Sequence, residues 1–217
     1  MPSPELFEIS NLKFEIPGFS RRIWARGARV RTIVSSRSKR PLAKDFVEVS
    51  QNSLSKQYLP RIEECLRRLS EDEIWWRPNP SSNSAGNLVL HLCGNVRQWI
   101  ISGLGSAEDL RERDLEFAEH GPIPRDRLIA ELRRTVREAC RVLGRMRESS
   151  LTKRYEIQGF RVSGLYAAFH VVEHFSHHAG QIIYITKLKR GEDLKFTHLP
   201  PIKKNRNRKP FAKVHSA

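Results

Sequence analysis

The sequence predicts an all-α fold, a four-helix bundle with a short extended segment before its last helix. Four long segments repeat apolar residues at three- and four-residue spacing, which is the period of an amphipathic helix. Turn-forming and capping residues separate these segments. The one stretch of alternating polarity, residues 154–162, is only nine residues long. Four amphipathic helices can bury their apolar faces against one another, which favours a bundle.

The first helix is expected over residues 42–70, where apolar side chains from Phe46 to Leu69 recur at helical spacing. Pro60 falls inside this run. It should kink or break the helix, because proline lacks the backbone N–H of an interior position. The next segment, 71–86, contains two prolines and several turn-forming residues and is predicted to be a loop.

The second helix is expected over residues 85–104. Ser84 is a suitable N-cap residue, and Gly103 and Gly105 are suitable residues for its end. The stretch 106–122 mixes acidic and basic residues without helical periodicity, so we expect an ordered loop there.

The third and fourth helices follow the same logic. The third is expected over 124–148, where apolar residues from Leu128 onward keep helical spacing. Residues 154–162 alternate in polarity and predict a short strand or hairpin. Ser163 then caps a fourth helix over 164–189.

Charge divides the chain into a neutral centre and two basic ends. The formal net charge is +15, of which residues 1–44 contribute +7 and residues 187–217 contribute +8. We therefore expect a bundle domain at 42–190, between a basic disordered extension at 1–41 and a basic flexible tail at 191–217. A nucleic-acid-binding domain would carry the charge on its folded body. Basic tails predict only nonspecific contacts with anionic partners.

Composition also bears on the compartment. No run of 18 apolar residues is present, so we expect no membrane span. The three cysteines, Cys65, Cys93 and Cys140, are scattered and odd in number, which is typical of a reducing compartment such as the cytoplasm. The Arg- and Ser-rich N-terminal stretch also has the composition of an organelle transit segment, which remains an alternative.

Two histidines of the fourth helix are the first candidates for a functional site. His174 and His178 are spaced i, i+4, which places both rings on one side of the helix, in a sector that is otherwise apolar. Two buried imidazoles need partners, since an unsatisfied buried polar group costs about 1–3 kcal/mol. A shared metal ion would satisfy both. The alternative is hydrogen bonding to carbonyl groups. Phe175 stands where a zinc protease would need glutamate, which excludes that motif.

A third metal ligand is expected in the second helix. His91 is flanked by apolar residues, so its ring should also face the interior. Asn95 and Gln98 lie one and two turns further on roughly the same face. They could orient a ligand or contact a substrate, or they could be ordinary surface side chains.

Three more side chains of the fourth helix lie near the expected ligands. His170 and His177 belong to the polar sector and are interpreted as rim residues rather than ligands. Gln181 lies close to the ligand direction. Together with His177 it could position a substrate, although a packing or capping role for Gln181 is an alternative.

Three stretches of this sequence resemble a known family. They are the W-R-P-loop-S-x-S-x-G-N-L-V-x-H-L run at 76–92, the ERDLEFA pattern at 112–118, and HVVEHFSHHAGQIIYITK at 170–187. In these stretches the chain is similar to the DinB-like (YfiT-like) superfamily of metalloenzymes, within an uncharacterised branch. The H-x-x-x-H-x-G-Q ending is the most specific part of the likeness.

The resemblance implies an up-down-down-up four-helix bundle in which His91, His174 and His178 bind one Zn²⁺ or Ni²⁺ ion. Characterised relatives use small-molecule thiols as S-transferases or isomerases, and several are homodimers. The expected function is therefore metal-dependent transfer of a thiol to a small electrophile, or a related metal-dependent reaction such as hydrolysis. A metal-binding stress protein without catalysis is the alternative. No carboxylate stands out as a catalytic residue. Nucleic acid is expected to meet only the KKNRNRKP tail and the N-terminal arginine cluster, nonspecifically.

Overall fold

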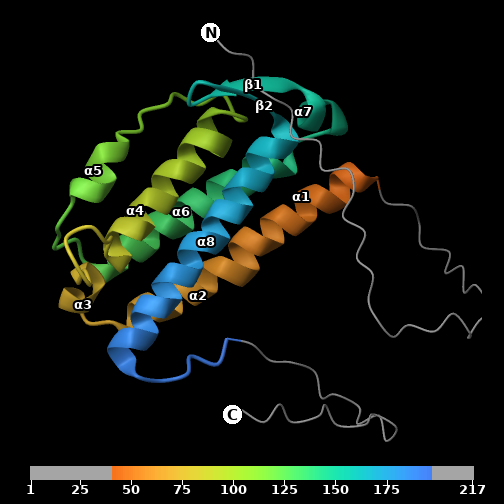
Figure 1. Cartoon of the computed structure of the whole chain (residues 1–217). Coiled ribbons are helices and arrows are strands. Elements are labelled where there is room, and N and C mark those ends of the chain that lie inside the picture. Colours follow the sequence, from red (N-terminus) through yellow and green to blue (C-terminus); the bar gives the residue numbers. More distant parts are fainter. Residues whose placement is uncertain (1–40, 197–217) are drawn as a thin grey trace, which may run out of the picture. The chain divides into compact units, whose positions relative to one another are not determined.

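The computed structural model describes residues 41–196. The extension expected at 1–41 and the tail expected at 191–217 lie outside this range, apart from residue 41 and residues 191–196. The described part is a helical bundle (Figure 1), as predicted. In chain order its elements are α1 (Leu42–Asn52), η1 (Ser53–Tyr58), α2 (Leu59–Arg68), α3 (Glu71–Trp75), α4 (Ala85–Val96), η2 (Arg97–Ser102), α5 (Arg113–Ala118), α6 (Arg125–Gly144), α7 (Glu148–Thr152), β1 (Arg154–Ile157), β2 (Phe160–Ser163) and α8 (Gly164–Arg190).

The first long helix passes through Pro60 without ending. Elements α1, η1 and α2 follow one another directly, and η1 is a π-helical turn immediately before α2. Pro60 occupies the first turn of α2, where the missing N–H is tolerated. The wider turn, in which Leu59 N bonds to Leu54 O, absorbs the proline. The helix continues with a local distortion, so of the two expected outcomes, a kink or a break, the break is wrong.

Two segments predicted as loops contain short helices. In 71–86, α3 begins at Glu71 because Ser70 and Glu73 form a reciprocal capping box. In 106–122, α5 spans six residues and buries none of them. Because none of its side chains is buried, its sequence has no apolar periodicity from which a helix could be predicted. Contacts with other segments hold it in place instead.

The extended segment is a hairpin, and it leads directly into α8. Strands β1 and β2 pair antiparallel, with Tyr155 opposite Val162. Gln158 and Gly159 both have positive φ, 53° and 78°, as a tight two-residue hairpin turn requires. The Ser163 side chain then accepts a hydrogen bond from Tyr166 N and caps α8, as predicted.

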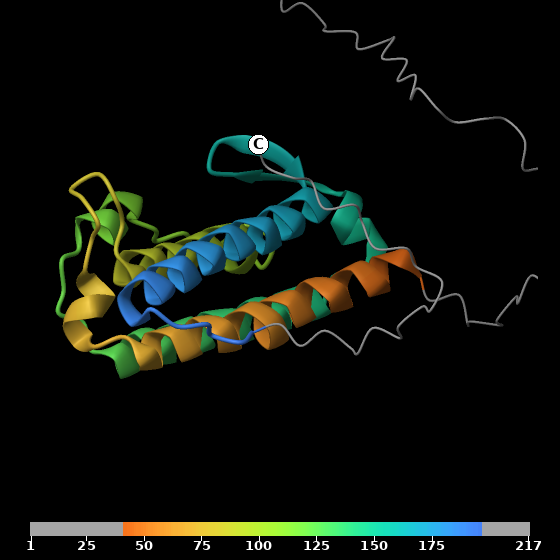
Figure 2. The same cartoon turned by 60° about the horizontal axis from the view of Figure 1, so that its bottom comes forward.

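Four long segments form the bundle. Helices α6 and α8 each pack against both α2 and α4. Helices α4 and α6 run in the same direction, and the first long helix and α8 run in the opposite one (Figure 1). This is the up-down-down-up arrangement. The hairpin and α7 lie at one end of the bundle, and α3 lies at the other (Figure 2).

The core forms where the four segments face one another. Its fully buried side chains include Leu54, Leu92, Leu132 and Phe175, one from each long segment. Three buried polar residues of α4, namely Asn87, His91 and Asn95, lie among these apolar side chains. Within residues 41–196, no helix combines the length and apolar character that a membrane span requires.

Candidate metal centre

The three predicted histidines meet between α4 and α8. His91 comes from α4, and His174 and His178 come from successive turns of α8. The Nε2 atoms of His91 and His174 lie 2.9 Å apart, and one ring nitrogen from each of the three residues lies within 4.8 Å of the others. In a tetrahedral site with metal–nitrogen bonds near 2.0–2.1 Å, two nitrogens are separated by about 3.4 Å. The three rings could therefore hold one metal ion after small side-chain adjustments.

Burial keeps the α8 rings uncharged. It lowers the pKa of His174 to about 3, with a further lowering from the nearby imidazoles. It also lowers the pKa of His178 to about 4, although the hydrogen bond to Gln181 partly opposes this shift. At neutral pH both rings are neutral, which is the form that binds a metal.

Glu116 fixes the orientation of His91. Its Oε2 lies 2.8 Å from His91 Nδ1 and can only accept, so Nδ1 carries the proton and Nε2 is left with its lone pair. Arg111 holds the same carboxylate through two hydrogen bonds of 2.7 and 2.9 Å. Burial alone would raise the pKa of Glu116, but the bonds from Arg111 and His91 outweigh it and lower the pKa. A carboxylate behind a histidine in this way is typical of metal-binding imidazoles.

The segment that carries Glu116 is tied to the start of α4. The Arg77 guanidinium donates to Asn87 Oδ1 and to the carbonyl oxygens of Phe117 and Glu119, at 2.8–3.1 Å. Asn87 Nδ2 donates to the carbonyl oxygens of Glu116 and Glu119. These bonds fix α5 beside α4 and so place the Glu116 carboxylate at His91.

Gly94 gives this carboxylate room to reach α4. A Cβ atom at Gly94 would lie 1.8 Å from Glu116 Oε1 and 2.9 Å from Arg111 Nε. Any side chain at this position would displace the ion pair. The glycine is therefore required by the close approach of α5 to α4.

The other four predicted site residues have different positions. Gln181 Oε1 accepts a hydrogen bond of 2.6 Å from His178 Nδ1, so it orients that ring as Glu116 orients His91. Gln98 does not reach the histidines; it binds Arg111 and Asp109, at 2.9 and 2.8 Å. The remaining two predicted residues, Asn95 and His177, form no hydrogen bond with any of the three rings.

Asn95 and His177 are best described with their neighbours. Asn95 Nδ2 lies 3.4 Å from His170 Nε2, and the His170 ring packs on Trp99 with centroids 4.1 Å apart. His170 is thus half-buried against Trp99, whereas the sequence predicted a position at the rim of the site. His177 is exposed, and its ring centroid lies 5.2 Å from that of His178.

The three rings open into a cavity of about 500 Å³. His170, Glu173 and His177 line it from α8, and Arg113 and Phe117 line it from α5. A small molecule that enters this cavity would reach the ring nitrogens directly. A guanidinium and a carboxylate flank its path.

A family assignment follows from comparison with known sequences. The sequence profile of a family described as "Protein of unknown function (DUF1572)" matches residues 41–203. The chain belongs to this family. None of the curated proteins searched matches this DUF1572 chain.

Solved structures support the fold of this family member. A conserved protein from Enterococcus faecalis is similar at 18% identity with a TM-score of 0.56, over 67% of this chain and 98% of that one. A DinB-like protein from Bacillus cereus matches at 16% identity and 0.51, over 66% and 90%. The DinB-like protein YjoA from Bacillus subtilis matches at 17% and 0.51, over 72% and 96%. The DinB-like fold expected from the sequence is confirmed.

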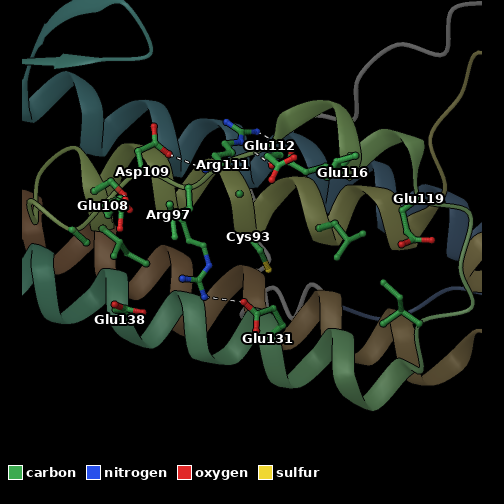
Figure 3. Close-up of a pocket in the computed structure, with 18 residues that line it drawn as sticks. Cys93, Arg97, Glu108, Asp109, Arg111, Glu112, Glu116, Glu119, Glu131 and Glu138 are labelled. Carbon is green, nitrogen blue, oxygen red and sulfur yellow. Dashed lines mark hydrogen bonds and ion pairs between the residues drawn. The ribbon is translucent and has the colours of Figure 1, made fainter.

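Behind the three histidines, this DUF1572 chain has a separate cavity of about 480 Å³. Arg111 and Glu116 line it on one side, and the Arg97–Glu131 ion pair lies across it, between η2 and α6 (Figure 3). The Arg111–Glu116 pair therefore stands between this cavity and His91. Neither member of the pair was predicted as a site residue from the sequence, although the ERDLEFA pattern contains Glu116.

Proposed function

We propose that this protein binds one divalent ion, Zn²⁺ or Ni²⁺, through His91, His174 and His178 and uses it to transfer a small-molecule thiol to an electrophile. The observation that carries the proposal is the convergence of three imidazole nitrogens from two helices on one cavity. Three neutral nitrogen ligands suit either ion and leave a coordination position open. When bound, the ion would supply a Lewis acid that favours the deprotonated form of a thiol or of water.

The residues around the ligands fit this metal. Two of the three imidazoles donate a hydrogen bond from Nδ1, His91 to Glu116 and His178 to Gln181. The Nε2 atom of each ring therefore carries the lone pair that a metal ion would bind. Arg111 balances the charge of Glu116, which therefore acts by orienting His91. A second set of oriented bonds behind the ligands is what metal-binding histidines generally need.

The thiol in this proposal comes from the substrate. Burial raises the pKa of Cys93 to about 12 and that of Cys65 to about 11, so both thiols stay protonated at neutral pH. Neither lines the cavity at the histidines. At the mouth of that cavity, Arg113 and Glu173 can bind opposite charges of a substrate.

Three unpaired cysteines favour the cytoplasm as the place where this activity would occur. We also propose a homodimer, which the resemblance to the DinB-like superfamily implies. On the side of α8 away from the core, Tyr166 and Phe169 are each 51% exposed and are candidates for the contact surface. Sedimentation of the purified chain would test this assembly.

The decisive experiment measures metal content after purification without chelators. The wild type should contain about one Zn²⁺ or Ni²⁺ per chain, and His174→Ala should contain far less. Each protein is then assayed with a panel of thiols and electrophiles. Absence of stoichiometric metal in the wild type would refute the metal site. Bound metal without turnover would instead support a metal-binding protein without catalysis.

A further inference from the structure

A second cavity adjoins the one that contains the histidines. It measures about 550 Å³ and is formed by loop residues 78–83, by α4 and by the C-terminal half of α8. Asn83 and His177 line both cavities, so the two share a boundary. A molecule with one end at the metal ligands can therefore extend into the second cavity.

The chemistry of this second cavity differs from that of its neighbours. Among residues 41–196, no lysine, arginine, aspartate or glutamate lines it. The cavity at the histidines contains Arg113 and Glu173, and the cavity of Figure 3 contains seven carboxylates. An uncharged surface of this kind does not attract an ionic group. It also offers no opposite charge to offset the free energy lost when that group leaves water.

Uncharged polar groups surround the space instead. They include the hydroxyl groups of Ser81 and Tyr184 and the amide of Asn83, and none of the three side chains has a hydrogen-bond partner among residues 41–196. Leu88 and Ile185 supply apolar contact. Such a lining suits a ligand that offers hydrogen bonds without charge.

Gly180 indicates that the space above α8 is used. A glycine inside a helix is destabilising relative to alanine, so it normally has a steric reason. Here a Cβ atom at Gly180 would meet no atom within 4 Å, so packing within the described chain supplies no such reason. Gly180 lines the second cavity, and any side chain there would occupy it.

One residue connects the second cavity to a proposed metal ligand. Gln181 lines it and holds His178 through Oε1. From His177 to Tyr184 the helix advances seven residues, or about 10 Å. This distance of about 10 Å matches a short chain of about six to eight bonded atoms attached to a reacting group.

From this geometry we infer that the second cavity binds the non-reacting body of the substrate, and that this body is uncharged and forms hydrogen bonds. The inference rests on the proposed function, in which the reacting thiol lies in the neighbouring cavity. It assigns Gly180 as a specificity-determining residue, because the absence of a side chain leaves room for that body.

The test uses the full chain loaded with Co²⁺, whose thiolate complexes absorb in the near ultraviolet. Four thiols are titrated at equal thiolate concentration: ethanethiol, which lacks a body; N-acetylcysteamine, which is uncharged; cysteamine, which is cationic; and 2-mercaptoethanesulfonate, which is anionic. N-acetylcysteamine should bind at least about tenfold more tightly than the other three. Equal or tighter binding of either charged thiol would overturn the inference.

Two variants distinguish this cavity from the metal site. Gly180→Leu should weaken N-acetylcysteamine about tenfold while leaving Co²⁺ content and ethanethiol binding unchanged. Lys187→Leu places the same leucine side chain at an exposed position of α8 outside both cavities, and it should bind every thiol as the wild type does. Unchanged binding of N-acetylcysteamine in Gly180→Leu would refute the inference alone. If no thiol gives the absorption band although Co²⁺ is bound, the thiol chemistry of the proposed function fails, and the inference fails with it.

Discussion

At the scale of single residues, Glu116 orients one of the three proposed metal ligands through one hydrogen bond. It accepts from His91 Nδ1 at 2.8 Å and thereby selects the tautomer with a free Nε2. We expect Glu116→Gln to lower metal affinity about tenfold, within the range of about 10–100-fold typical for such partners. Competition with a fluorescent chelator measures the change. Glu112→Gln, at an exposed position just before α5, should bind metal as the wild type does. Equal affinities of Glu116→Gln and the wild type would contradict the assignment.

A pair of glycine substitutions makes opposite predictions. Gly94→Ala would place a Cβ atom 1.8 Å from Glu116 Oε1. It should therefore destabilise the protein by about 1–3 kcal/mol, as overpacking does, and should weaken metal binding. Gly180→Ala meets no atom within 4 Å and should stabilise α8 by about 0.5–1 kcal/mol. Urea unfolding of both variants checks the signs. A stable Gly94→Ala with full metal affinity would mean that Glu116 does not need this close approach.

At the scale of the elements, helices α2 and α6 are joined by one buried carboxylate. Glu63 of α2 accepts two hydrogen bonds of 2.6 Å from Arg133 of α6 and one of 2.8 Å from Arg67. Burial would raise the pKa of Glu63, but these bonds outweigh it and the pKa is lowered from 4.5. The carboxylate is therefore more acidic in the folded chain than in the unfolded chain.

This difference gives a dependence of stability on pH. Because the folded pKa lies below the unfolded one, the contribution of Glu63 is complete above about pH 4.5 and is lost as the pH falls through the folded value. Arg133 is 48% exposed, so solvent screening limits the contribution to about 1 kcal/mol. The free energy of unfolding of the wild type minus that of Glu63→Gln, measured in urea from pH 7 to pH 3, should shrink at the acidic end. A constant difference would show that the ion pair does not join the helices as described.

At the scale of the whole molecule, the sequence predicted the features that local patterns determine. The four helices, their caps at Ser84 and Ser163 and the hairpin all follow from periodicity and turn chemistry. The sites missed depend on contacts between distant segments. Glu116 meets His91 across 25 residues, and α5 has no buried side chain to give it a periodic pattern. Two signals of that approach stood in the sequence, namely Gly94 inside a predicted helix and Glu116 within the ERDLEFA pattern.

The positions of the three histidines on two helices should couple metal binding to the stability of the bundle. The ligands come from two helices that run in opposite directions, α4 and α8, so an ion would bind only when both are packed together. A ligand at 100 times its Kd that binds only the folded state stabilises it by about 2.7 kcal/mol. For a chain of this size that corresponds to a rise in Tm of about 5–11 °C. We expect Zn²⁺ to produce such a rise in chelator-treated protein, measured by circular dichroism.

Two histidines of α8, one inside and one outside the cluster, provide the controls for this last prediction. His174→Ala removes a ligand and should abolish the metal-induced rise in Tm, whatever its effect on the metal-free protein. His177→Ala removes an exposed ring next to His178 and outside the ligand cluster, and it should keep the full rise. If the two variants respond to Zn²⁺ alike, the ion binds elsewhere on the chain. A rise that depends on His174 alone would place the ion between α4 and α8, because only there does that ring meet His91.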